Sequence, residues 1–103
     1  MTAFHHTPVL LTETLALLSP ERGGTFVDGT LGGGGHAEAV LERLPQDGRL
    51  IGIDRDEEAV KAAGERLQGY ASRFRALHGN FFDMDRLLAA EGIFQVNGIL
   101  LDL

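Results

Sequence analysis

The chain has 103 residues, 44% of them hydrophobic, which suits one small globular domain. Nine basic and fifteen acidic side chains leave a net charge of −6, and the basic residues are scattered along the sequence, so overall charge does not favour binding a polyanion. The sequence has no cysteine, and its four histidines have no ligand-like spacing, so we expect neither disulfides nor a bound metal. It also shows no apolar run of membrane length and no signal peptide, so we expect a cytoplasmic protein without membrane contact.

The hydrophobic pattern predicts a leading helix and then four strands that alternate with helices. Thr7-Pro8 is typical of a helix start, since threonine can cap and proline suits the first helical position, and Ser19-Pro20 ends that helix. Such strand-helix repeats form a parallel sheet covered by helices, so the predicted fold class is α/β. The expected strands are 25–28, 49–54, 74–78 and 97–103, and the expected helices between them are 36–44, 56–68 and 84–91.

The sequence stops at Leu103, at the end of the fourth predicted strand. Doubly wound sheets usually continue further, because later strands cover the other side of the point where the strand order reverses. We therefore expect residues 1–103 to be the N-terminal part of a domain truncated after its fourth strand; a compact four-stranded domain is the alternative. Ile99, Leu100 and Leu101 would then lie at an unpaired sheet edge, which predicts self-association.

The segment TFVDGTLGGGGH, residues 25–36, places five glycines between the first predicted strand and the helix that follows. Glycine allows positive φ and lets a ligand approach the backbone without Cβ atoms in the way. The helix that follows directs its free N–H groups toward the same place. Ligands of open α/β sheets bind outside the carboxyl ends of the strands, so the loop indicates a nucleotide-like site, with a flexible turn as the alternative.

Two aspartates at strand ends narrow the class of ligand. Asp54 comes 22 residues after Gly32, where an acidic residue typically accepts hydrogen bonds from ribose hydroxyls; capping the next helix is the alternative. Asp28 would repel a pyrophosphate, but it can accept a hydrogen bond from an ammonium group or from loop amides. Gly32, Gly34 and Ala37 also satisfy the G-x-G-x-x-A dinucleotide pattern. The aspartates nevertheless favour S-adenosylmethionine, which has an ammonium group, a ribose and no phosphate, over NAD.

Five segments, taken together, carry a more specific signal. In chain order they are HTPVLLTE at 6–13, VDGTLGGGGH at 27–36, GIDRD at 52–56, HGNF at 78–81 and GILLDL at 98–103. They resemble the MraW family, also called RsmH, of bacterial small-subunit ribosomal RNA methyltransferases. The resemblance implies a Rossmann-like class I methyltransferase fold, S-adenosylmethionine as cofactor, and methylation of N4 of a cytidine in 16S rRNA. It also implies that the RNA surface lies in parts of the family that follow residue 103.

The resemblance further assigns roles to residues at matching positions. Asp54 would hold the ribose, and Phe81 would stack on the adenine. Asp102 would face the reactive end of the cofactor and accept a hydrogen bond from the cytidine amine, which makes it the candidate catalytic residue. The expected cofactor-binding set is Asp28, Gly32, Gly34, Gly35, His36, Asp54, Phe81 and Asp102.

Structural alternatives stay open for several of these residues. Phe81 could serve core packing, with Phe82 as the rival for the adenine, and Asp102 could cap a loop. His36 could be only a first-turn helix residue, and His78 is interpreted as a structural histidine at a strand end. For the whole chain, the alternatives are an NAD-type oxidoreductase domain and a non-catalytic, self-associating fragment. We expect the 103 residues alone to lack activity.

Overall fold

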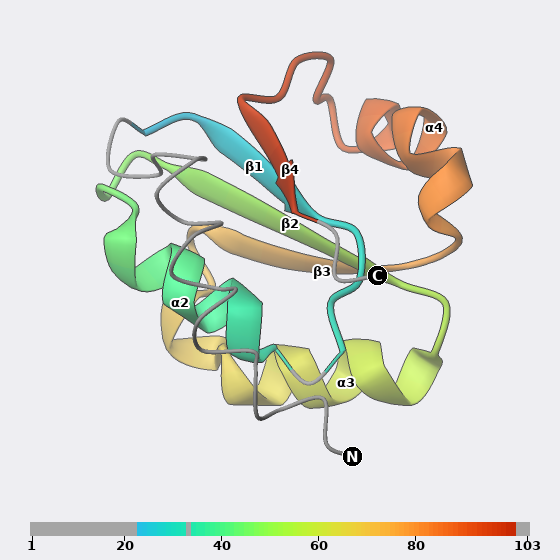
Figure 1. Cartoon of the computed structure of the whole chain (residues 1–103), viewed down its shortest axis with the longest axis horizontal. Coiled ribbons are helices and arrows are strands. Elements are labelled where there is room, and N and C mark those ends of the chain that lie inside the picture. Colours follow the sequence, from blue (N-terminus) through green and yellow to red (C-terminus); the bar gives the residue numbers. More distant parts are fainter. Residues whose placement is uncertain (1–22, 33, 101–103) are drawn as a thin grey trace.

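The computed structural model describes residues 23–32 and 34–100, and its centre is a four-stranded parallel sheet (Figure 1). The strand order is β3-β2-β1-β4. The strands are β1 (Thr25–Asp28), β2 (Arg49–Asp54), β3 (Phe74–His78) and β4 (Gly98–Leu100). All pairings are parallel, so the predicted α/β class is confirmed. The predicted leading helix after Thr7-Pro8 and the end of the fourth strand lie outside the described residues.

The helices between the strands also agree with the sequence pattern. They are α2 (Gly35–Arg43), α3 (Glu57–Arg66) and α4 (Met84–Ala90), with short 3₁₀ turns η2 (Gln68–Tyr70) and η3 (Phe81–Asp83). Asp56 lies just before α3 and accepts a hydrogen bond from the Glu58 amide at 2.9 Å, so it caps that helix. The turn η3 has no counterpart in the sequence prediction.

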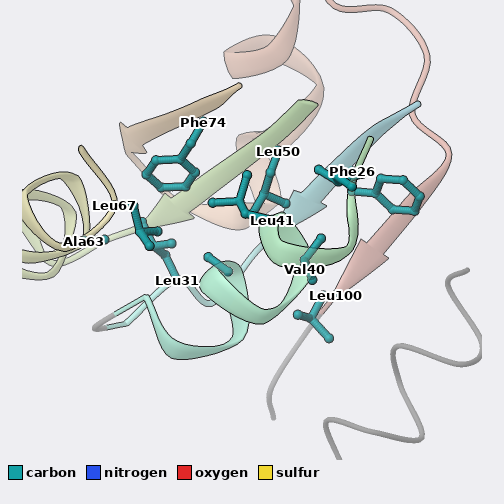
Figure 2. Packing of buried hydrophobic residues seen from close by; sticks show 11 residues of the cluster. Phe26, Leu31, Val40, Leu41, Leu50, Ala63, Leu67, Phe74 and Leu100 are labelled. Carbon is teal, nitrogen blue, oxygen red and sulfur yellow. The ribbon is translucent and has the colours of Figure 1, made fainter. Parts of the chain in front are cut away.

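Helices α2 and α3 cover one face of the sheet (Figure 1). Successive side chains of a strand point to opposite faces, which directs Phe26, Leu50 and Phe74 toward these helices. Figure 2 shows side chains of this cluster that come from the strands, from α2 and from the end of α3. The cluster consists of Phe26, Leu31, Ala37, Val40, Leu41, Leu44, Leu50, Ala63, Leu67, Phe74 and Leu100.

The opposite face of the sheet packs on α4 and the segment that follows it. Val27, Ile51 and Ile53 form a second buried cluster there with Leu88 and Ile93. Both faces of β2 are therefore buried, which explains why its sequence RLIGID shows little alternation of apolar and polar residues. No helix within the described ranges is long and apolar enough to cross a membrane.

Strands β3 and β4 form the two edges of the sheet in the part of the chain that the structure describes. On β4, Ile99 is 39% exposed, whereas Leu100 is buried in the core. The expected edge position of this strand is confirmed for its described residues. Self-association through the edge stays a prediction.

Candidate functional site

A cavity of about 510 Å³ opens at the carboxyl ends of β1, β2 and β3. This is where open α/β sheets bind their ligands, and its size falls in the range of about 300–1,000 Å³ usual for small-molecule sites. Asp54 and Phe81 are the two members of the predicted cofactor set that line it. The lining residues within the described ranges are Gly29, Thr30, Asp54, Arg55, Gly79, Asn80, Phe81 and Phe82.

Asp28 holds the start of the glycine loop through a hydrogen bond to its backbone. Its side chain is completely buried, and Oδ1 accepts a hydrogen bond from the Thr30 amide at 3.0 Å. The neighbouring Gly29 amide donates to the Leu100 carbonyl of β4 at 2.9 Å. Asp28 therefore holds a loop amide, one of the two roles considered for it, and does not belong to the cavity lining.

Asp54 connects the glycine loop to the region before α3. Its Oδ2 accepts from the Gly32 amide and its Oδ1 from the Asp56 amide, both at 2.9 Å. Because each carboxylate oxygen has two acceptor sites, both oxygens retain capacity for the hydroxyls of a ligand. Gly32, which does not itself line the cavity, is thus joined to it through the Asp54 carboxylate.

Leu31 anchors the glycine loop in the core. Its side chain is 3% exposed and lies against Gly52 of β2, where an added Cβ would come within 2.5 Å of Leu31 Cδ1. The Leu31 amide also donates to the Ile53 carbonyl at 3.2 Å. Our sequence analysis missed this pair. The available signals were an apolar residue inside a glycine-rich run and a glycine inside a buried strand.

Gly34, Gly35 and His36 lie at the start of α2 and are not part of the cavity lining. Gly34 has a φ of 93°, a backbone conformation that side chains rarely adopt, whereas a Cβ there would meet Leu67 Cδ1 at an ordinary contact distance of 3.4 Å. As the N-cap of α2, Gly34 offers no side-chain acceptor to the first-turn amides. His36 Nε2 is buried and has no hydrogen-bond partner within residues 23–32 and 34–100.

Two adjacent phenylalanines form the wall of the cavity that follows β3. Phe81 is partly buried and Phe82 is 89% exposed, with ring centroids 6.3 Å apart at an interplanar angle of 64°. Asn80 Oδ1 accepts from the Phe82 amide at 2.9 Å, which fixes the η3 turn that carries both rings. The contribution of Asn80 was not predicted, although asparagine is a common residue for such caps.

His78 donates from Nε2 to the Arg55 carbonyl at 2.9 Å, and this contact ties the end of β3 to the residue after β2. The contact has the structural character predicted for this histidine. Among the described residues, no group of three histidine, aspartate or glutamate side chains is placed to hold a metal ion. Asp102, the candidate catalytic residue, lies outside the described residues.

Solved structures define the class of protein to which this fold belongs. An S-adenosylmethionine-dependent O-methyltransferase from Thermotoga maritima has a TM-score of 0.73 at 19% identity, covering 93% of this chain and 35% of that one. The O-methyltransferase TomG from Streptomyces achromogenes, solved in complex with S-adenosylmethionine, has a TM-score of 0.73 at 25% identity, covering 87% of this chain and 42% of that one. The chain therefore has the Rossmann-like fold of these methyltransferases.

The family follows from the sequence comparisons. The model of the MraW methylase family matches residues 3–103, and the chain belongs to this family, as its motifs predicted. The ribosomal RNA small subunit methyltransferase H of Trichlorobacter lovleyi is 54% identical over 103 residues, covering 100% of this chain and 33% of that protein. Its Geobacter sulfurreducens counterpart is 52% identical over 99 residues, covering 96% and 32%. The chain thus spans about a third of the length of these relatives.

Proposed function

We propose that the chain forms the cofactor-binding part of an S-adenosylmethionine-dependent methyltransferase that acts in the cytoplasm on N4 of a cytidine in small-subunit ribosomal RNA. Membership of the MraW methylase family and the name of the relatives support ribosomal RNA as the substrate. The observation that carries the proposal is the cavity at the strand ends, which Asp54 and Phe81 both line and where the Asp54 carboxylate accepts a hydrogen bond from the Gly32 amide of the glycine loop. The cytidine site and the RNA surface are proposed for the whole protein, and the 103 residues alone are proposed to be inactive.

The lining of the cavity fits an adenosine. Asp54 can accept hydrogen bonds from both ribose hydroxyls, and an aromatic face such as Phe81 can stack on the adenine. The buried Asp28 just beneath the loop disfavours a pyrophosphate, as in NAD. The methionine part would extend toward the start of α2, where Gly34, Gly35 and His36 are proposed to contact it and first-turn amides suit its carboxylate.

The chemistry requires little from the protein beyond binding and orientation. Bound S-adenosylmethionine would supply an electrophilic methyl group. The cytidine amine is a poor nucleophile, because its lone pair is delocalised into the ring. Asp102 is the proposed acceptor of an N4 hydrogen bond, which would help to localise that pair and to orient the amine for in-line attack. Such orientation can supply a large part of a rate enhancement.

The direct test of this proposal is calorimetric titration of the chain with S-adenosylhomocysteine and, separately, with NAD. We expect saturable binding of the first ligand only. Binding of NAD in its place, or no binding by a chain shown by circular dichroism to be folded, would contradict the proposed cofactor site.

Replacing Phe81 tests the adenine wall. Base-aromatic stacking contributes about 1–3 kcal/mol, so we expect Phe81→Ala to weaken S-adenosylhomocysteine binding by about 5- to 150-fold. Phe82→Ala is the matched control, because this neighbouring ring is 89% exposed and we expect at most a small effect. Thermal unfolding of both variants separates the effect of stacking from that of packing. A larger decrease in affinity for Phe82→Ala would give the adenine role to Phe82.

A further inference from the structure

A depression of about 170 Å³ lies at the amino ends of β2 and β3, at the opposite end of these strands from the cofactor cavity. It contains three of the nine basic residues of the chain, together with a serine hydroxyl. Its lining consists of Arg49, Ile51, Ala71, Ser72, Arg73, Phe74 and Arg75. The expectation that basic residues are scattered holds along the sequence but is wrong for these three in space.

The register of the sheet explains why these arginines meet. Ile51 pairs with Arg75, and the Leu50 amide donates to the Arg73 carbonyl, which places Arg49 beside Arg73 at the start of the two strands. Side chains two residues apart on a strand point to the same face. This register places Arg49 diagonal to Arg75 on the same face of the sheet, where two positive charges cost stability unless an anion compensates them.

The protein compensates this charge only in part. Arg75 Nε lies 2.9 Å from Glu91 Oε1 but remains 62% exposed. The Arg73 guanidinium is directed toward the end of α2, where Nη1 donates to the carbonyls of Leu44 and Pro45 at 3.0 and 3.1 Å and Cζ lies 5.5 Å from the centroid of the Tyr70 ring. Arg49 is exposed. Among the described residues, Arg49 and Arg75 thus share one close carboxylate, that of Glu91, and the depression keeps an excess of positive charge.

We propose that this depression binds a phosphate group of an RNA backbone, as a second site of RNA binding remote from the methyl-transfer site. Guanidinium forks match the geometry of phosphate oxygens, and the Ser72 hydroxyl adds a donor. The depression of about 170 Å³ has room for a phosphate group, since a water molecule takes only about 30 Å³ in the liquid. RNA is favoured over free phosphate because the groups are open to solvent, and exposed guanidinium groups can follow a strand that passes over the surface.

The two sites can act on one RNA molecule. They lie at the two ends of β2, which separates them by about 17 Å at about 3.3 Å per residue. Binding to a phosphate carries no sequence information but fixes the position of the substrate. The choice of RNA as the partner rests on the proposed function.

The test compares two double variants with the same change of charge. Arg49→Gln/Arg75→Gln removes two charges from the depression. Lys61→Gln/Arg86→Gln removes two exposed charges elsewhere, one of them also in an ion pair, since Arg86 lies 3.2 Å from Asp83. Binding of a fluorescent single-stranded RNA is measured by anisotropy over a series of salt concentrations, and S-adenosylhomocysteine binding is measured by calorimetry.

We expect the depression variant to bind RNA about tenfold more weakly than the control variant, with a salt slope reduced by about 0.7 for each phosphate that the variant no longer neutralises. S-adenosylhomocysteine affinity should stay unchanged in both variants. Equal RNA affinity and equal slopes in the two variants would overturn the proposal, as would an unaltered chain that binds no RNA. If binding of titrated inorganic phosphate depends on Arg49 and Arg75 while binding of RNA does not depend on them, the assignment of RNA as the ligand is wrong. Failure of the unaltered chain to bind S-adenosylhomocysteine would instead count against the cofactor proposal alone.

Discussion

Asp54→Ala is expected to weaken S-adenosylhomocysteine binding by about 150- to 25,000-fold, the equivalent of about 3–6 kcal/mol. Hydrogen bonds to a charged group contribute about 1.5–3 kcal/mol each, and the carboxylate is proposed to accept two from the ribose. It also accepts from the Gly32 and Asp56 amides, so its removal releases the glycine loop. Calorimetry measures the total effect. Glu65→Ala, on the exposed surface of α3, is the control for removing one acidic side chain.

The direct and indirect effects of Asp54 can be separated with two smaller ligands. Adenosine carries the ribose hydroxyls, and 2′,3′-dideoxyadenosine lacks them. We expect the unaltered chain to prefer adenosine and Asp54→Ala to bind both ligands with similar affinity. A variant that still prefers adenosine would show that Asp54 acts through the position of the loop and does not bind the ribose.

The contact between Leu31 and Gly52 is expected to dominate the stability of the loop. Gly52→Ala places a Cβ within 2.5 Å of Leu31 Cδ1 inside a packed core, and such overpacking costs about 1–3 kcal/mol. Leu31→Ala removes a side chain that is 3% exposed, and such a deletion costs about 2–5 kcal/mol. Urea unfolding of each variant measures both decreases in stability.

The double variant provides the decisive comparison. Leu31→Ala creates the space that the new methyl group needs, so we expect the two single effects to sum to more than the effect of the double variant, by about 0.5–3 kcal/mol. Gly64→Ala is the control, because a Cβ at this exposed position of α3 meets no atom within 4 Å. Simple additivity of the Leu31 and Gly52 substitutions would show that their contact does not hold the loop.

The sequence predicted the fold best where the residues of a single strand identify that strand without reference to its neighbours. Buried strands such as RLIGID are recognisable from apolar residues bounded by turns, and all four strands were predicted within the described residues. The position of Asp54 at a strand end also followed from spacing alone. Asp54 and Phe81 line the cavity, and their binding roles stay predictions, as do those of Asp28, which holds the Thr30 amide, and Gly34, which has a positive φ.

Contacts that depend on how neighbouring strands are paired could not be predicted from the residue pattern of one strand. The contact of Leu31 with Gly52 joins two segments through the core, and neither residue has a polar group to indicate a role. The arginines of the depression are brought together by the register between β2 and β3. The absence of alternation in strands buried on both faces removes the usual guide to that register.

The cavity that is proposed to recognise the cofactor is lined by residues from one continuous part of the chain. The described residues that line it lie between Gly29 and Phe82, at the ends of three consecutive strands and in the loops that follow them. One uninterrupted stretch of coding sequence therefore specifies the proposed adenosine pocket. Asp102, the proposed acceptor of the cytidine amine, lies outside that stretch in the sequence, so its substitution would leave the described lining of the proposed cofactor pocket unchanged.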